Sequence, residues 1–341
     1  AQIVGFTNID DVGQEGLELA YEDWLGGEPG AKRVIKDGRH DIIEDVESIS
    51  RPHPGKDLAL SIDRRIQYLA YRELKSVMQE HNARAASAVV LDVKSGEVLA
   101  MVNQPSFNPN NRQQLRSSHM RNRAVTDVFE PGSTMKPFIV AAALQDGRFR
   151  PETPVSTSPG WFRVGVNTVR DVHDYGQLDV TGVLRKSSNV GISKIALKLP
   201  LENIWSMLSD IGFGAQTYSG FPGEATGLLS HHGGWNQIET ATLSYGYGVS
   251  VTALQLAQAY AVLATDGLKR SVTFLREGDV SEERRVMPAQ VARQVRAMLE
   301  EATGPDGTAP EARVSGYRVA GKTGTIKKSE AGGYSSNKYV S

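Results

Sequence analysis

The sequence contains no cysteine in its 341 residues. That absence excludes disulfide bonds, thiol catalysis and metal sites with cysteine ligands. No stretch approaches the length of a membrane span, which needs about 18 consecutive apolar residues. The chain does not open with a signal segment, in which basic residues precede an apolar run. Because 38 basic side chains balance 39 acidic ones, there is no bulk attraction to nucleic acid or to an anionic membrane.

Metal-ligand spacing is also absent from the histidines. His173, His231 and His232 show no pairing typical of a metal site. We therefore predict no metal and no cofactor. The chain opens at Ala1–Phe6, which looks like the middle of a strand, and closes at Tyr339–Ser341, which looks like the start of another. These ends lead us to expect further chain on both sides.

Composition and chain breaks predict two unequal domains. With 40% hydrophobic and 23% charged residues, the composition is that of a globular protein. Residues 1–56 are rich in Gly, Asp and Glu and too few for a large core. They suggest a short helix at Leu17–Leu25 and paired strands within Lys32–Ile49, before the linker Arg51–Gly55. Residues 57–341 form the predicted main domain.

Within the main domain, apolar periodicity and caps predict a mixture of helices and strands. Asp63 is the expected cap of a helix that runs to about Asn82. The other expected elements are a strand at 57–62, a hairpin of 85–93 with 97–102, a polar loop at 103–123, helices at 180–186, 190–199, 252–266 and after Pro288, and a strand at 317–326.

The stretch Val128–Leu144 organises the chain. Pro131 and Gly132 predict a turn, and Phe138–Leu144 is apolar on every face, which indicates a buried helix. Gly147 is suited to the left-handed cap that ends it.

Ser133 and Lys136 occupy the expected first turn of that helix. Residues three apart share a face, so the amine can reach the hydroxyl. Helix N-terminal amides favour negative charge at the same place. This combination suggests a nucleophile, a base and an oxyanion hole, provided that burial lowers the pKa of the lysine. Taken alone, Ser-x-x-Lys also fits a helix cap with a surface lysine.

Two further segments fit the first. Ser187-Ser188-Asn189 lies between two expected helices, where helix capping is the alternative explanation. Lys322-Thr323-Gly324-Thr325 lies on the expected late strand, with Lys322 on one face and both threonines on the other. Gly324 would let another backbone approach. An edge strand protected by a lysine is the alternative there.

In order and spacing, the three segments together resemble the signature of the penicillin-recognising serine acyltransferases. Ser188 stands where class A β-lactamases carry Asp, and their Glu-x-x-Leu-Asn segment is absent. Five further segments are similar to class B penicillin-binding proteins, above all the septal cell-division transpeptidases of the penicillin-binding protein 3 type: Phe6–Asp10, Gly13–Gly16, Glu130–Ser133, Lys186–Gly191 and Tyr245–Gly248.

This resemblance implies a fold of the α/β (α+β) class: the serine β-lactamase and penicillin-binding-protein transpeptidase fold, with an antiparallel sheet flanked by helices. Residues 1–56 would be part of a pedestal or dimerisation-like domain, and residues 57–341 a transpeptidase domain lacking its last strands and helix. It further implies an N-terminal membrane anchor upstream and a location on the periplasmic side of the bacterial inner membrane.

The resemblance also implies roles for individual residues. Ser133 would attack the carbonyl between two D-alanines of a peptidoglycan stem peptide, and Lys136 would be the base. The other implied roles are an oxyanion hole from the Ser133 and Thr325 amides, a carboxylate site at Thr323 and Thr325, a proton route through Lys322 and Ser187, a bond from Asn189 to the substrate amide, an added substrate strand along Gly324, and a cleft border at Tyr247.

Several alternatives stay open. A D,D-carboxypeptidase or a β-lactamase would admit water to the same acyl-enzyme, and a penicillin sensor would use the fold without catalysis. Glu130 fits a structural carboxylate, Lys327 a surface lysine and Tyr245 core packing. The partners implied by the resemblance are stem peptides, β-lactams, cell-division proteins and a lipid II polymerase, with no nucleic acid.

Overall fold

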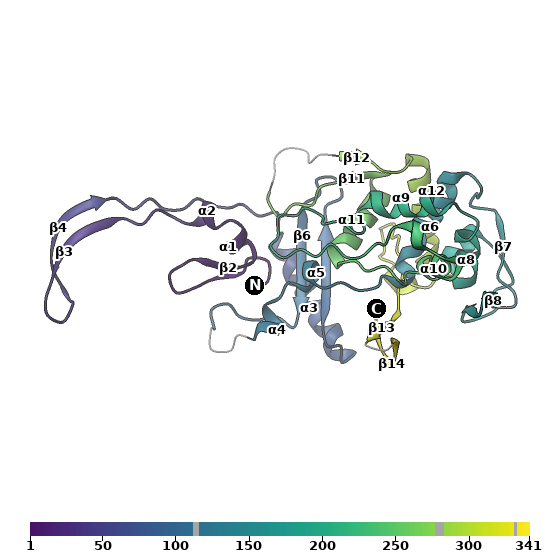
Figure 1. The fold of residues 1–341 in the computed structure, drawn as a ribbon, viewed down its shortest axis with the longest axis horizontal. Helices are drawn as coiled ribbons and strands as arrows, with labels where there is room; N and C mark the ends of the chain where they lie inside the picture. Colours follow the sequence, from purple (N-terminus) through teal and green to yellow (C-terminus); the bar gives the residue numbers. More distant parts are fainter. Residues whose placement is uncertain (112–115, 277–282, 331–332) are drawn as a thin grey trace.

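A computed structural model describes residues 1–111, 116–276, 283–330 and 333–341. It shows a slender N-terminal arm that extends from a larger body built mainly of helices (Figure 1). Among the described residues, none of the helices combines the length and the apolar character that crossing a bilayer requires.

The arm consists of short elements. They are β1 (Phe6–Thr7), β2 (Gly13–Glu15), α1 (Gly16–Ala20), α2 (Glu22–Leu25), β3 (Ala31–Lys36) and β4 (Ile42–Ser50). The expected paired strands are confirmed, since β3 and β4 are antiparallel with Ala31 opposite Ser50. The expected helix is interrupted at Tyr21, whose φ of −116° and ψ of 26° leave the helical range. The strand expected at Ala1–Phe6 is wrong, because residues 2–4 form a turn.

The body begins with α3 (Arg64–Glu80), followed by the hairpin of β5 (Ala86–Leu91) and β6 (Val98–Gln104). The Asp63 carboxylate accepts hydrogen bonds from the N–H groups of Arg65 and Ile66, which confirms the predicted cap. No strand forms at 57–62. Pairing there stops at a single bridge between Leu60 and Leu275, which is too short for a ladder.

The core surrounds α6 (Lys136–Asp146). Every residue of α6 from Lys136 to Ala143 is buried, as the apolar run predicts. The Phe138 ring meets the rings of Phe213 and Tyr260 edge-to-face, at centroid distances of 5.7 and 5.3 Å. The helices around it are α8 (Asn189–Ala196), α9 (Leu201–Ile211), α11 (Ala253–Ala264) and α12 (Ala289–Ala302). Gly147 ends α6 at a φ of 83°.

The remaining elements are short. The helices are α4 (Ser117–Met120), α5 (Arg123–Thr126), α7 (Val180–Arg185) and α10 (Gln237–Leu243), with 3₁₀ turns η2 (Gly132–Met135), η3 (His232–Gly234) and η4 (Pro310–Ala312). The strands are β7 (Pro154–Ser156), β8 (Trp161–Val164), β9 (Asn167–Arg170), β10 (Gln177–Asp179), β11 (Leu268–Arg270), β12 (Glu283–Arg285), β13 (Ile326–Glu330) and β14 (Gly333–Val340). Sheets in the described residues are antiparallel pairs of strands flanked by helices, in agreement with the predicted fold class.

The late strand differs from the prediction. It begins at Ile326 rather than at Tyr317, so Lys322–Thr325 lies outside any ladder. In the ladder of β13 with β14, Ile326 lies opposite Val340. Tyr339 is therefore near the end of a strand and does not begin a new one.

Candidate active site

Ser133 lies in the 3₁₀ turn η2, directly before α6. The predicted location was the first α-helical turn, and the difference is small, because the Lys136 N–H bonds to the Ser133 carbonyl in the i→i+3 pattern of a 3₁₀ turn. That geometry aligns residues i and i+3 on one side of the turn. Ser133 is half-buried, so its hydroxyl lies at the boundary between core and solvent.

The amine of Lys136 joins the first two motifs. Its Nζ donates to the Ser187 carbonyl at 2.5 Å, to Ser187 Oγ at 3.1 Å and to Asn189 Oδ1 at 2.8 Å. The Lys136 side chain is fully buried, and desolvation lowers its pKa well below the usual value. The charge of Lys322 lowers this pKa further, whereas Asp171 raises it. Donating all three bonds requires the ammonium form, but the lowered pKa makes the neutral amine accessible, and that form keeps two N–H donors and has a lone pair that can accept a proton.

Asp171, which sequence reasoning did not identify, holds the second motif in place. Its carboxylate accepts hydrogen bonds from the Ser188 hydroxyl at 2.5 Å, the Asn189 N–H at 2.5 Å and the Val190 N–H at 3.0 Å. Ser188 also accepts from the N–H of Gly191 at 2.8 Å, so the predicted helix cap is present as well. These bonds fix the start of α8, from which Asn189 reaches Lys136.

Ser187 adopts a φ of 57°, in the left-handed region that serine rarely enters. This conformation follows α7 and precedes the cap of α8, so the bend presents both the carbonyl and the hydroxyl of Ser187 to Lys136. Backbone strain of this kind persists only where the surroundings enforce it. Here the Asp171 bonds on the following residues supply that constraint.

The third motif passes alongside the nucleophile. A Cβ added to Gly324 would lie 2.9 Å from Thr134 Cγ2 and 3.1 Å from the Pro131 carbonyl oxygen. A Cβ on Gly132 would lie 3.5 Å from Cβ of Ile326. Glycine at 324 therefore permits the close backbone approach that the sequence suggests, and the segment after Lys322 borders the turn that carries Ser133.

The side chains of the third motif bond to other residues of the chain. Lys322 Nζ donates to the Thr323 carbonyl at 2.9 Å, whereas Ser187 Oγ is bonded by Lys136. The Thr323 hydroxyl donates to Thr308 Oγ1 at 3.0 Å, and the Ser341 hydroxyl donates to Thr325 Oγ1 at 3.3 Å. Burial lowers the pKa of Lys322 to about 8.

Tyr247 packs among aromatic rings. It meets Tyr245 at a centroid distance of 5.5 Å and Tyr334 at 5.0 Å, both edge-to-face. Glu130 accepts hydrogen bonds from the Gly248 N–H and the Tyr334 hydroxyl, so its role here is structural, as the sequence suggests.

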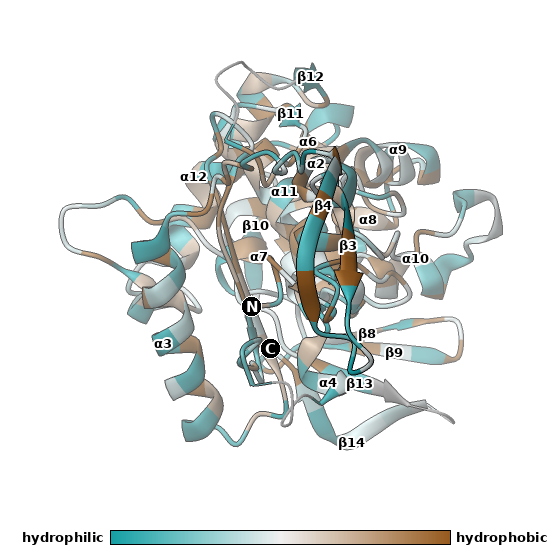
Figure 2. Cartoon of the chain, turned by 90° about the vertical axis from the view of Figure 1, so that its left-hand side faces the viewer, coloured by the Kyte–Doolittle hydropathy of each residue, from teal (hydrophilic) through white to brown (hydrophobic). Residues whose placement is uncertain are grey.

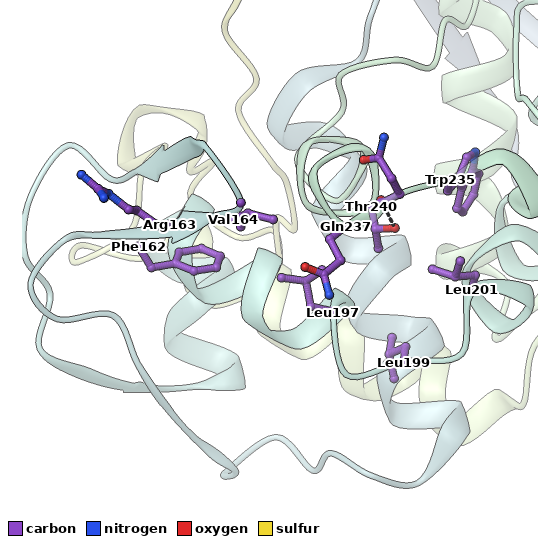
Figure 3. Close-up of a pocket in the computed structure, with 11 residues that line it drawn as sticks. Phe162, Arg163, Val164, Leu197, Leu199, Leu201, Trp235, Gln237 and Thr240 are labelled. Carbon is purple, nitrogen blue, oxygen red and sulfur yellow. Dashed lines mark hydrogen bonds between the residues drawn. The ribbon is translucent and has the colours of Figure 1, made fainter.

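Several hollows lie elsewhere. One of about 370 Å³ lies between the β8–β9 hairpin, the end of α8 and the start of α10, lined by residues such as Phe162, Leu197, Trp235 and Gln237 (Figure 3). None of the predicted site residues lines it. Within the described part of the chain, no group of three or more histidine, aspartate or glutamate side chains could hold a metal ion.

Comparisons with known proteins agree with the three motifs. Residues 86–341 match the penicillin-binding protein transpeptidase domain, and residues 1–60 match the penicillin-binding protein dimerisation domain. The probable peptidoglycan D,D-transpeptidase PbpC of Pseudomonas aeruginosa is 43% identical over 341 residues, which are 100% of this chain and 60% of that protein. The peptidoglycan D,D-transpeptidase FtsI of Escherichia coli K12 is 44% identical over 340 residues, 100% of this chain and 57% of that protein.

A solved structure shows the same fold. The apo transpeptidase domain of penicillin-binding protein 3 from Burkholderia pseudomallei is 44% identical, with a TM-score of 0.76 over 84% of this chain and 82% of that chain. The chain spans about three fifths of the length of the curated relatives named here. The chain thus belongs to the penicillin-binding protein transpeptidase family.

Proposed function

We propose that this protein is a serine-type peptidoglycan D,D-transpeptidase of the septal class B type, which cross-links stem peptides through an acyl-enzyme on Ser133. The observation that supports it most strongly is the buried Lys136 amine, bonded to Ser187 and Asn189 beside the nucleophile turn. Buried away from water, this amine has a lowered pKa and suits the role of base.

The proposed reaction first forms an acyl group on Ser133 and then transfers it. The Ser133 oxygen attacks the carbonyl of the penultimate D-alanine while neutral Lys136 takes the hydroxyl proton. The backbone N–H groups of Ser133 and Thr325 stabilise the oxyanion. When the tetrahedral intermediate collapses, the C–N bond breaks and the leaving D-alanine amine receives a proton through Ser187 and Lys322. An amine from a neighbouring stem then attacks the ester carbonyl, the new C–N bond forms as the C–O bond to Ser133 breaks, and the proton that the amine loses passes through Lys136 to the Ser133 oxygen.

The remaining site residues would hold the substrate. Asn189 bonds the stem-peptide amide, and the hydroxyls of Thr323 and Thr325 hold the terminal carboxylate near the charge of Lys322. The stem peptide lies beside Gly324 as an added strand. Support comes from the backbone, because Gly324 lies directly against the nucleophile turn, where an added Cβ would be 2.9 Å from Thr134 Cγ2. Tyr247 borders this groove.

The cellular setting is part of the proposal. Residues 1–56 would belong to an N-terminal pedestal or dimerisation-like domain, and residues 57–341 to the transpeptidase domain. The natural protein would be anchored by an upstream helix on the periplasmic side of the inner membrane, with cell-division proteins and a lipid II polymerase as partners. Recovery of the natural protein with membranes, and its digestion by protease only in cells with a permeabilised outer membrane, would test this location.

Two measurements on the purified protein test the activity. Intact mass should show one β-lactam adduct that persists for many minutes, and a stem-peptide thioester should give more amide product when an amine acceptor is added. Adduct turnover within seconds would instead indicate a β-lactamase, and product that ignores the acceptor a D,D-carboxypeptidase. A stable adduct with no product from any stem substrate would indicate a sensor.

A further inference from the structure

Glu130 links three segments that are distant in sequence. It lies three residues before Ser133, and its Oε1 accepts a hydrogen bond from the Gly248 N–H at 2.8 Å and another from the Tyr334 hydroxyl at 2.9 Å. One carboxylate oxygen therefore connects the nucleophile turn, the Tyr-Gly-Tyr-Gly segment and the start of β14.

The Tyr334 phenol is suited to donate this bond over the whole physiological range. Desolvation raises its pKa, and the hydrogen bond to Glu130 raises it further. Hydrogen bonds to a charged acceptor are about twice as strong as neutral ones. The ring centroids of Tyr334 and Tyr247 are 5.0 Å apart, with an angle of 82° between the ring planes. Both the hydroxyl and the ring of Tyr334 therefore have a contact that holds them.

The same hairpin is attached to the nucleophile turn at its base. Ile326 is buried, and its Cβ lies against Gly132. Because Thr325 directly precedes Ile326, the hairpin continues the segment that borders Ser133. Ile326 fixes one end of the β13–β14 hairpin, and Tyr334, on the returning strand opposite Ser329, fixes it farther along.

We propose that Glu130 and Tyr334 form a positioning pair that holds the β13–β14 hairpin, and with it Thr323–Thr325, in register with Ser133. Its catalytic consequence depends on the proposed acyl transfer. The pair touches no reacting atom. It acts by fixing the segment that receives the substrate carboxylate, whereas the Lys136 side of the site is fixed separately by Asp171 and α8.

The test uses Tyr334→Phe, which removes the donor and retains the ring against Tyr247. Tyr339→Phe is the matched control, since this tyrosine lies on the same strand, is 56% exposed, and its hydroxyl donates a long hydrogen bond of 3.4 Å to the Ser336 carbonyl. Glu130→Ala removes the acceptor, and Glu130→Gln restores an oxygen at the same position. Hydrogen exchange across 326–340 and pre-steady-state acylation are measured on each variant.

For Tyr334→Phe we expect exchange in the hairpin to become about tenfold faster, with little change in α6. The dissociation constant of the pre-covalent β-lactam complex should rise about five- to tenfold, and the first-order acylation rate should also fall several-fold, because Thr325 carries both a contact to the carboxylate and one N–H of the oxyanion hole, whereas the base does not move. Glu130→Gln should recover most of the protection that Glu130→Ala loses, and Tyr339→Phe should match the parent protein.

If Tyr334→Phe left hydrogen exchange in the hairpin unchanged, the proposed positioning pair would be refuted. The same would follow if Tyr339→Phe accelerated the exchange equally. Equal losses in α6 and in the hairpin would show general destabilisation instead and would also contradict it. If the parent protein formed no adduct, the proposed acyl transfer would fail, yet the exchange comparison would still decide whether the pair holds the hairpin.

Discussion

Lys136 has an unusual environment for a single residue, because its whole side chain lies in the core. A buried charge is costly unless it is paired, and a lysine so placed tends to lose its proton. Three oxygens of Ser187 and Asn189 satisfy the amine without supplying a full negative charge. The residue is therefore hydrogen-bonded and poised as a base.

Replacing Lys136 by alanine should slow β-lactam acylation by about 10³-fold, since a positioned general base contributes about 10²–10⁴-fold. Stopped-flow acylation with a fluorescent penicillin measures this loss. Lys198→Ala, at an exposed lysine after α8, is the control and should acylate normally. A near-normal rate for Lys136→Ala would mean that another group is the base.

The charge of Lys322 predicts the alkaline side of the pH profile. Burial lowers its pKa to about 8, so the amine is cationic below that pH and neutral above it. If the cation attracts the substrate carboxylate, the second-order acylation rate should fall as the pH rises through about 8. In Lys322→Arg the guanidinium stays charged, so any activity that remains should lack this fall. A profile that stays flat to pH 10 in the parent protein would contradict the assignment.

Single residues were predictable only where the chemistry is local in sequence. Ser133 and Lys136 could be paired from their spacing alone. Asp171 could not be, because it binds the amides of a helix that starts 18 residues later, and nothing near it in sequence marks that contact. The bond between Thr323 and Thr308 was likewise invisible before the segments were brought together.

At the scale of elements, the Tyr245–Gly248 segment packs directly against the nucleophile turn. Gly246 has a φ of 89°, and a Cβ there would lie 2.2 Å from the Gly132 carbonyl oxygen and 2.3 Å from its nitrogen. Gly248 has a similar φ of 74°, but a Cβ there would meet nothing within 4 Å. Alanine at these two positions therefore distinguishes the cost of a left-handed backbone from the cost of a close contact.

Gly248→Ala should therefore cost about 1 kcal/mol, from the left-handed backbone alone. Gly246→Ala must also displace the Gly132 backbone, and we expect at least about 3 kcal/mol together with a large loss of acylation. Thermal unfolding and penicillin labelling of the two variants side by side measure the difference. Equal effects would show that the close approach is unimportant.

Helices were easier to predict than strands. A helix carries its caps and periodicity in its own residues, which is why α3, α6 and α11 were located from Asp63, the apolar run and Thr252. We did not predict α9 from the sequence, although its apolar residues have helical spacing: Leu201, Ile204, Leu208 and Ile211. The late strand was misplaced because a strand is defined by its partner, and Ile326 pairs with Val340, which the local pattern around Tyr317 does not reveal.

For the whole molecule, the β3–β4 hairpin lies largely outside the core. All nine residues of β4 are exposed, and Ile35, Ile43 and Ile49 are 49, 66 and 61% exposed. Figure 2 shows apolar stretches on both strands of this hairpin, in front of the body. Burial in the body thus contributes little to the hairpin, and the hairpin should contribute little to the body.

Replacing residues 32–49 by a two-residue Asn-Gly turn between Ala31 and Ser50, which are paired across the strands, should leave the body intact. We expect the midpoint of thermal unfolding to change by less than about 2 °C and acylation to be unaffected, because few contacts that stabilise the core are removed. Differential scanning calorimetry checks this. A large drop in the unfolding midpoint would show that the β3–β4 hairpin stabilises the body.

The prediction of two domains rests on composition and on the Arg51–Gly55 linker, because a segment without enough apolar residues cannot form a large core. The extended form of the arm could not be predicted. The alternating residues in Lys32–Ile49 predict paired strands, but they do not indicate which other residues cover those strands.

The central claim is that three distant segments converge on the hydroxyl of Ser133. The most direct measurement is peptide mapping of the protein after reaction with a β-lactam, with Ser133→Ala treated in parallel. The account predicts a single adduct, on the peptide that contains Ser133, and no adduct on a folded Ser133→Ala protein. An adduct on any other residue, or equal labelling of Ser133→Ala, would contradict it.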